Sequence, residues 1–165
     1  MEDQALERLI GILGKETDLL GELHAALAGQ QGALQKGDAE GIKKSVEVQI
    51  AVLSKISGLE RERVALVSML QSGRDCGGED LTLTFLIEFA PQHAERLREV
   101  RAALADVLKA IGTLNRHNSM LINQSLSYIS KTLRMIAGED TSSTVYTPAG
   151  DVTCATGQLA VDRKI

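Results

Sequence analysis

Apolar residues recur three and four positions apart over the first part of the chain. The row runs through Leu6, Leu9, Leu13, Leu20, Leu23, Leu27 and Leu34, with Glu16 and Gln30 at two of its positions. This heptad spacing predicts an amphipathic helix over about 4–36. Gly37 then suits the left-handed conformation that commonly ends a helix.

A second helix is predicted over about 38–72, because Asp38 can cap its start and Glu40 complements the helix dipole. The connection between the two helices is so short that they must lie antiparallel, as a helical hairpin. The apolar row of this helix is expected at Ile42, Val46, Gln49, Leu53, Ile56, Glu60, Arg63, Val67 and Leu70, flanked by Val52, Leu59 and Leu66.

The glycine-rich run SGRDCGGED over residues 72–80 breaks the helical pattern. An apolar segment follows and predicts a short helix over about 81–89. Pro91 is expected in the first turn of a third helix over about 91–137. Its row contains Leu97, Val100, Leu104, Val107, Ile111, Asn115, Asn118, Ile122, Leu126, Ile129, Leu133 and Ile136. The eleven-residue step from Ile111 to Ile122 places the polar run LNRHNS on the row, where polar residues set register or a contact.

Residues 139–165 show no period and have few apolar side chains. Such a segment cannot bury enough surface to offset its ordering entropy, so a mobile C-terminal tail is expected there. The predicted fold is all-α: an elongated antiparallel helical hairpin plus a long third helix, forming a three-helix coiled-coil-like bundle over residues 1–138.

Composition agrees with long helices, since 44% of the 165 residues are hydrophobic but only 2% are aromatic. The net charge of −4 gives no field that would attract nucleic acid. The chain shows neither a signal peptide nor an apolar run long enough to span a membrane, so a cytoplasmic location is expected. Cys76 and Cys154 lie far apart without metal-ligand spacing, which favours reduced thiols.

The sequence offers no catalytic, cofactor or metal site. His24, His93 and His117 are scattered and lack ligand partners at a known spacing, so each is interpreted as a helix-surface histidine. A histidine phosphotransfer module, using His24 or His93, is one alternative function. A coiled-coil adaptor that self-associates is another.

The apolar row of the third helix is the best candidate for binding. A three-segment bundle has few neighbours to cover each row, so the stripe Ile122, Leu126, Ile129 and Leu133 is expected to stay partly exposed as a groove for a partner helix. Packing of the stripe on the hairpin, or in a homodimer, is the alternative.

The order of these features resembles the FlgN family of flagellar type III export chaperones. The hairpin matches the family's Leu-Glu-x-x-Arg segment at Leu59, Glu60 and Arg63. The third helix matches its Asn-rich start and Leu/Ile run over residues 115–126. The tail matches at residues 146–150 and at the basic residues 163–164.

The resemblance implies a chaperone, not an enzyme, that binds the C-terminal helices of flagellar hook-associated (hook–filament junction) proteins. It would prevent their premature assembly and deliver them to the export gate and the export ATPase components. Tyr146, the lone large aromatic residue of the tail, is expected to dock on the gate. Client binding is expected on the third helix, at Asn118, Leu121, Ile122, Leu126, Ile129 and Leu133.

Overall fold

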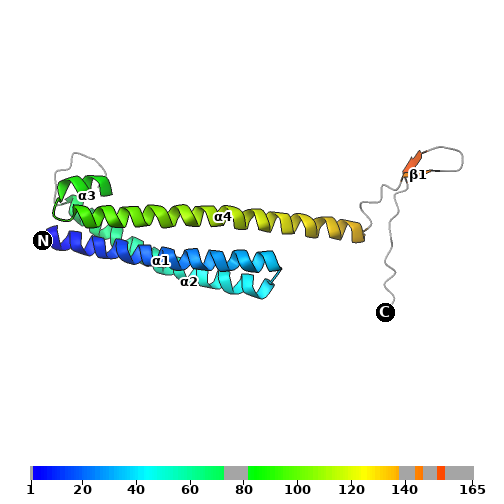
Figure 1. Cartoon of the computed structure of the whole chain (residues 1–165), viewed down its shortest axis with the longest axis horizontal. Helices are drawn as coiled ribbons and strands as arrows, with labels where there is room; N and C mark the ends of the chain where they lie inside the picture. Colours follow the sequence, from blue (N-terminus) through cyan, green and yellow to red (C-terminus); the bar gives the residue numbers. More distant parts are fainter. Residues whose placement is uncertain (1, 73–81, 138–143, 147–151, 155–165) are drawn as a thin grey trace. The chain divides into compact units, whose positions relative to one another are not determined.

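The computed structural model describes residues 2–72, 82–137, 144–146 and 152–154. Its helices are α1 (Glu2–Lys36), α2 (Ala39–Ser72), α3 (Leu83–Phe89) and α4 (Ala94–Ala137) (Figure 1). An all-α fold with long helices is therefore confirmed. The chain divides into two compact units, Met1–Ser119 and Met120–Ile165, and the boundary falls within α4. The predicted domain boundary near residue 138 stays a prediction.

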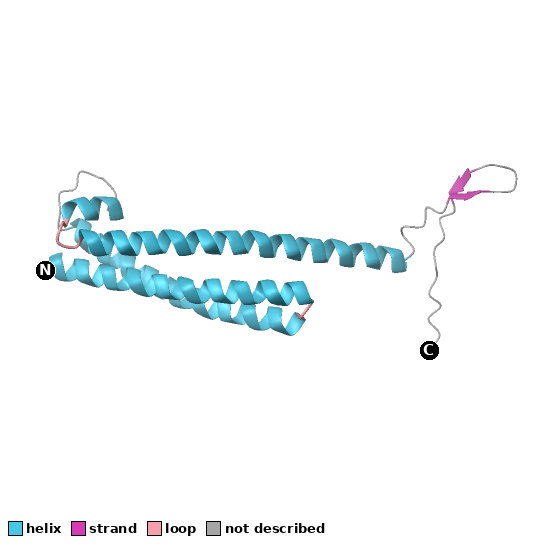
Figure 2. Cartoon of the chain, viewed as in Figure 1, coloured by secondary structure: helices cyan, strands magenta, loops and turns pink. Residues whose placement is uncertain are grey.

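The α1–α2 turn is built around Gly37, whose φ of 67° lies in the left-handed region. The amide of Gly37 donates to the Leu34 carbonyl, and the amide of Asp38 donates to the Ala33 carbonyl at 2.9 Å. This pair of bonds is the Schellman motif that satisfies carbonyls at a helix end. The Asp38 carboxylate then accepts from the Gly41 amide and so caps α2. Figure 2 shows how little loop separates the two helices.

The buried face of α2 differs from the predicted row. Val46 and Leu53, placed on that row by the sequence, are exposed, whereas the flanking residues Val52 and Leu66 are buried. The face toward the other helices follows positions 45, 49, 52, 56, 59, 63, 66 and 70, none of which is exposed. The predicted row is therefore right at Gln49, Ile56, Arg63 and Leu70 but wrong at Val46, Leu53 and Glu60, where the packed face follows the adjacent positions 45, 52 and 59 instead. Two neighbouring apolar rows on one helix fit the heptad pattern almost equally well.

The unit Met1–Ser119 has two apolar clusters in its core. The cluster near the start of α1 also draws on α2, α3 and α4, and its buried residues are Leu6, Leu9, Ile10, Ile12, Leu13, Leu66, Leu70, Leu86, Ile87, Ala90, Ala94 and Leu97. The cluster nearer the α1–α2 turn contains Leu23, Leu27, Val52 and Ile111. Three helices contribute to both clusters, which explains how the α1–α2 hairpin and the first part of α4 hold together.

A polar contact follows each apolar cluster along α1. Glu16 is buried just after the first cluster, and its Oε1 atom lies 3.6 Å from Nε of Arg63 on α2. Gln30 is buried just after the second, and its Oε1 atom accepts a hydrogen bond from Asn118 on α4. The two polar breaks in the α1 row thus reach polar partners on two different helices, as register-setting residues do.

Within this unit α1 and α4 run in the same direction. His93, just before α4, contacts Asp3 near the start of α1, and Asn118 contacts Gln30 near its end. Figure 1 shows the two helices side by side. The α1–α2 hairpin makes α2 antiparallel to α1, so α2 is also antiparallel to the first part of α4.

The short helix α3 is capped by Thr82, whose hydroxyl accepts a hydrogen bond from the Phe85 amide. Leu86 and Ile87 fix it to the core. Phe85 and Phe89 stack on each other with ring centroids 5.8 Å apart, and Phe89 is half exposed. Aliphatic residues, rather than the two aromatic ones, therefore anchor this helix.

In the unit Met120–Ile165, strands β1 (Thr144–Tyr146) and β2 (Val152–Cys154) pair antiparallel, with Tyr146 opposite Val152. The sequence did not predict these strands, because segments of three residues are too short for a period-two pattern to be recognised. The rest of the predicted mobile tail, at 139–143, 147–151 and 155–165, lies outside the described residues.

Candidate functional site

The second half of α4 carries large apolar side chains that are exposed to solvent. Ile122 is 38% exposed, Leu126 58%, Ile129 52% and Leu133 59%. Leu121, the remaining apolar residue proposed from the sequence, is half-buried. These four exposed residues, together with Ile136, form a continuous row that we call the long row.

The long row continues the helix face that is buried earlier in α4. At about 100° per residue, Leu97, Ile111 and Asn118 lie on the same side of the helix as Ile122 and Ile129. The first three are buried and the last two are exposed. One helix thus uses one face for two purposes: its first part packs in the core and its second part presents apolar surface.

A shallow hollow of about 450 Å³ lies along the long row. Its lining comes from Leu126, Ile129, Ser130, Leu133, Arg134 and Ala137. Four of these six residues are aliphatic, and the guanidinium group of Arg134 adds a positive charge. Such a surface can accept an apolar side chain from a partner helix and attract a neighbouring carboxylate.

Asn118 does not belong to this surface. Its side chain is 2% exposed, and Nδ2 donates to the Leu27 carbonyl and to Oε1 of Gln30, both at 3.0 Å. These bonds hold the Asn118 side chain, which the sequence interpretation placed among the client contacts, against α1 in this structure. Its role is to join α4 to α1.

Glu16 is a charged group in a poorly solvated position. Burial raises the pKa of its carboxyl, and the nearby Arg63 guanidinium offsets part of that effect. Arg63 also donates to Glu60, with Nη2 2.6 Å from each carboxylate oxygen. The guanidinium is therefore shared between two carboxylates, and Oε1 of Glu16 has no hydrogen-bond partner among the described residues.

His93 was interpreted as a surface histidine, but it is buried at the start of α4. Its Nε2 atom lies 2.5 Å from Asp3 Oδ1, and its Nδ1 atom lies 3.4 Å from Glu7 Oε1. Arg96 also binds Glu7. The hydrogen bond from His93 lowers the pKa of the Asp3 carboxyl. Both ring nitrogens face carboxylates and the ring is buried, so His93 is unsuited to accept a phosphoryl group.

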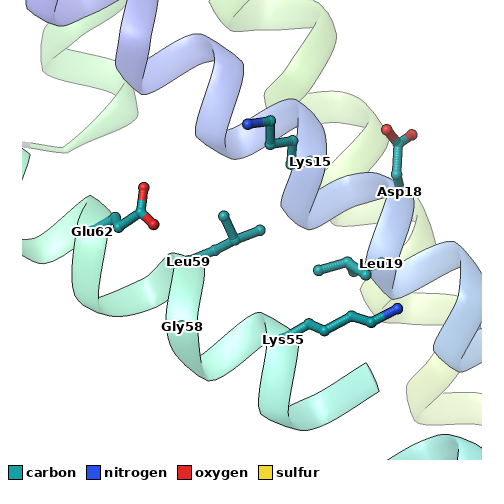
Figure 3. A pocket seen from close by; sticks show the side chains of 7 residues that line it. All are labelled: Lys15, Asp18, Leu19, Lys55, Gly58, Leu59 and Glu62. Carbon is teal, nitrogen blue, oxygen red and sulfur yellow. The ribbon is translucent and has the colours of Figure 1, made fainter. Parts of the chain in front are cut away.

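A second hollow, of about 420 Å³, lies between α1 and α2. Figure 3 shows the side chains of Leu19 and Leu59 between the two helices, with charged side chains around them. Lys15, Asp18, Lys55 and Glu62 also line it, beside Gly58. Its two lysines and two carboxylates balance in charge, and nothing about it points to a reaction.

Two kinds of site are not found among the described residues. Among them, no three histidine, cysteine or acidic side chains come together as metal ligands would. In the same part of the chain, no helix combines the length and apolar character that crossing a bilayer requires. Tyr146, proposed for docking, lies in β1, outside α4.

Residues 1–153 match the family model described as FlgN protein. No curated protein and no solved structure matches the chain. Because the family match spans nearly the whole length, including α1, α2, α3 and α4, the chain belongs to the FlgN family of flagellar export chaperones.

Proposed function

We propose that this protein binds the C-terminal helices of flagellar hook-associated proteins, prevents their premature assembly and delivers them to the export gate. Family membership supports the general role of export chaperone. The exposed long row of α4 supports helix binding in particular. An amphipathic client helix that packed on this row would shield both apolar surfaces from water, which requires neither a nucleotide nor a catalytic group.

The proposed client contacts are Leu121, Ile122, Leu126, Ile129 and Leu133, without Asn118. A single observation carries this choice: four of these five apolar side chains are exposed on one helix face. Isolated exposed apolar residues are common on protein surfaces, but a contiguous row of this length is typical of an interaction site.

The proposal is tested by titrating the full chain with the C-terminal segments of hook-associated proteins in a calorimeter. We expect binding, and we expect Ile129→Asp to weaken it by about tenfold or more, because a charge replaces a side chain whose burial contributes about 1.5–3 kcal/mol. Ser127→Asp is the matched control, since it adds the same charge on the polar side of α4. It should bind almost normally.

Circular dichroism and light scattering complete the test. Both variants should keep the helicity of the native chain, because Ile129 and Ser127 are both exposed. Loss of helicity in Ile129→Asp alone would mean that Ile129 packs in a core. No binding of any segment, together with a stable homodimer through α4, would favour the self-associating adaptor instead.

Export requires a second contact, which we place on Tyr146 in β1. In this proposal α4 holds the client while the C-terminal segment engages the gate and the export ATPase components. Separating the two contacts along the chain lets a chaperone hold its client and dock at the same time.

A further inference from the structure

The described end of α4 carries a second apolar row beside the long row. Leu121, Tyr128 and Met135 recur at intervals of seven, and we call them the heptad row. Tyr128 is 73% exposed and Met135 69%. At about 100° per residue, the centres of the two rows lie about 120° apart around the helix. The two rows are therefore distinct surfaces of one helix.

The combined apolar face is wider than one partner helix covers. From Leu126 at one edge to Met135 at the other, it spans about 180° of the helix circumference. The apolar stripe that faces a protein core is about 100° wide or somewhat more, and the stripe that packs on a single neighbouring helix in a coiled coil is narrower. A single client helix centred on the long row would leave Tyr128 and Met135 in water.

Small residues separate the two rows, which leaves room for two neighbours. Ser125 and Thr132 lie between the rows, seven residues apart. The hydroxyl of Thr132 donates to the Tyr128 carbonyl at 3.0 Å, so it is satisfied within α4. Two helices packed on the two rows could therefore contact each other above this strip of small residues.

The charges of this segment indicate the chemistry of the partner. Between Met120 and Ala137 the charged residues are Lys131 and Arg134, whereas the whole chain has a net charge of −4. Arg134 lines the hollow on the long row. A second copy of the same segment would bring like charges together, so complementarity favours a different chain with acidic residues beside its apolar stripe.

We propose that the client docks on α4 as two amphipathic helices of one chain, one on the long row and one on the heptad row, with acidic residues facing Arg134 and Lys131. This inference rests on the proposed chaperone function. It adds that α4 recognises a pair of client helices and that the client residues beside Arg134 and Lys131 are acidic.

The experiment compares two probes on the full chain by calorimetry. The first is a C-terminal segment of about 18 residues from a hook-associated protein, enough for one helix as long as the long row. The second is a segment of the same protein extended to about 45 residues, enough for two such helices and a turn. We expect the longer probe to bind in a 1:1 ratio and about tenfold or more tightly than the shorter one.

Double variants of each row show which row each probe contacts. Tyr128→Ser with Met135→Ser should weaken the longer probe by about tenfold and leave the shorter probe within about twofold. Ile129→Ser with Leu133→Ser should weaken both probes. Ser127→Ala is the control and should change neither. If the heptad-row variant binds the longer probe normally, the helix-pair inference is wrong, although the chaperone function stands.

A charge reversal on α4 tests whether the client presents acidic residues there. Arg134→Glu should weaken the longer probe severalfold and reduce its dependence on salt, because fewer ion pairs form on binding. An unchanged or tighter complex would contradict an acidic contact edge. If neither probe binds the native chain, both the proposed function and this inference fail, and light scattering would then show whether a second copy covers α4.

Discussion

Glu16 shows how one buried carboxylate affects the stability of the hairpin. It is 8% exposed between α1 and α2, and its partner Arg63 is shared with Glu60. Burial raises the pKa of Glu16 from its usual 4.5, so the folded protein disfavours the ionised form. The contribution of Glu16 to stability is therefore fully present below about pH 4.5 and is lost as pH rises through the higher folded-state pKa.

We predict that Glu16→Gln makes the protein more stable than the native chain at pH 7 and about equally stable at pH 4. The amide stays neutral, so it avoids the desolvation of a carboxylate, and Arg63 keeps Glu60 as its partner. The measurement is urea unfolding followed by circular dichroism at both values of pH.

Asp18→Asn is the control for this experiment, because it removes an exposed carboxylate from the same helix. For each variant, the free energy of unfolding is compared with that of the native chain at both values of pH. The gain in stability between pH 4 and pH 7 should be larger for Glu16→Gln than for Asp18→Asn. A Glu16→Gln protein that is less stable than the native chain at pH 7 would mean that attraction to Arg63 outweighs burial.

The sequence revealed that polar residues interrupt the apolar rows, but it did not reveal their partners. Glu16, Gln30 and Asn118 were all identified at row positions, yet Asn118 was assigned to the client surface. Its hydrogen bonds to Leu27 and Gln30 join residues about ninety positions apart in the sequence. Such pairing depends on the register in which α4 packs against α1. His93 was missed for the same reason, since its partners Asp3 and Glu7 are as distant in sequence.

At the level of helices, the α1–α2 junction was more predictable than the packed face of α2 or the start of α4, which begins at Ala94 because residues 91–93, with Pro91, form a turn instead of the first helical turn. Gly37 and Asp38 were identified as the end of one helix and the start of the next from local chemistry, and the structure shows both caps. The packed face of α2 was not predictable, because its exposed Val46 and Leu53 fit a heptad as well as its buried Val52 and Leu66 do. Choosing between such rows requires knowing where α1 and α4 lie.

Glycines in and between the helices should respond oppositely to alanine. We predict that Gly37→Ala destabilises the protein by about 1–2 kcal/mol, because the left-handed conformation at φ 67° is unfavourable for a residue with a Cβ atom. Gly14→Ala, inside α1, should stabilise it by about 0.5–1 kcal/mol. A Cβ atom at Gly14 meets no neighbour within 4 Å. Thermal unfolding of the two variants checks both values.

The two substitutions are a matched pair, since each adds one methyl group to a glycine with free space around it. Their difference therefore isolates backbone conformation from packing. If both variants were stabilised, the α1–α2 turn would have to adopt a different conformation in solution.

For the molecule as a whole, the sequence showed the apolar row of α4 but not whether it is covered. Leu97 and Ile129 occupy equivalent positions on the same helix face, yet the first is buried and the second is half exposed. Exposure depends on how many neighbouring helices reach each part of α4, which no local pattern records. The structure thus supplied the observation on which the proposed client surface depends.

Two tyrosines allow the holding and delivery steps to be separated. Tyr128 lies on α4 in the heptad row, and Tyr146 lies in β1. We predict that Tyr146→Ala leaves the affinity for the client segment within about twofold but abolishes export of hook-associated proteins. Tyr128→Ala should instead weaken binding of the longer client segment, which is proposed to cover the heptad row. Calorimetry measures the first property, and the amount of hook-associated protein in the culture medium measures the second.

The pattern of the two defects decides between the possible roles of Tyr146. If Tyr146→Ala weakens the client complex as much as Tyr128→Ala does, then Tyr146 belongs to the client surface and the two steps share one site. If export is normal in Tyr146→Ala, the gate contact lies elsewhere. Restored export in Tyr146→Phe would show that the aromatic ring, rather than the hydroxyl, makes the contact, because only the ring is common to the two residues.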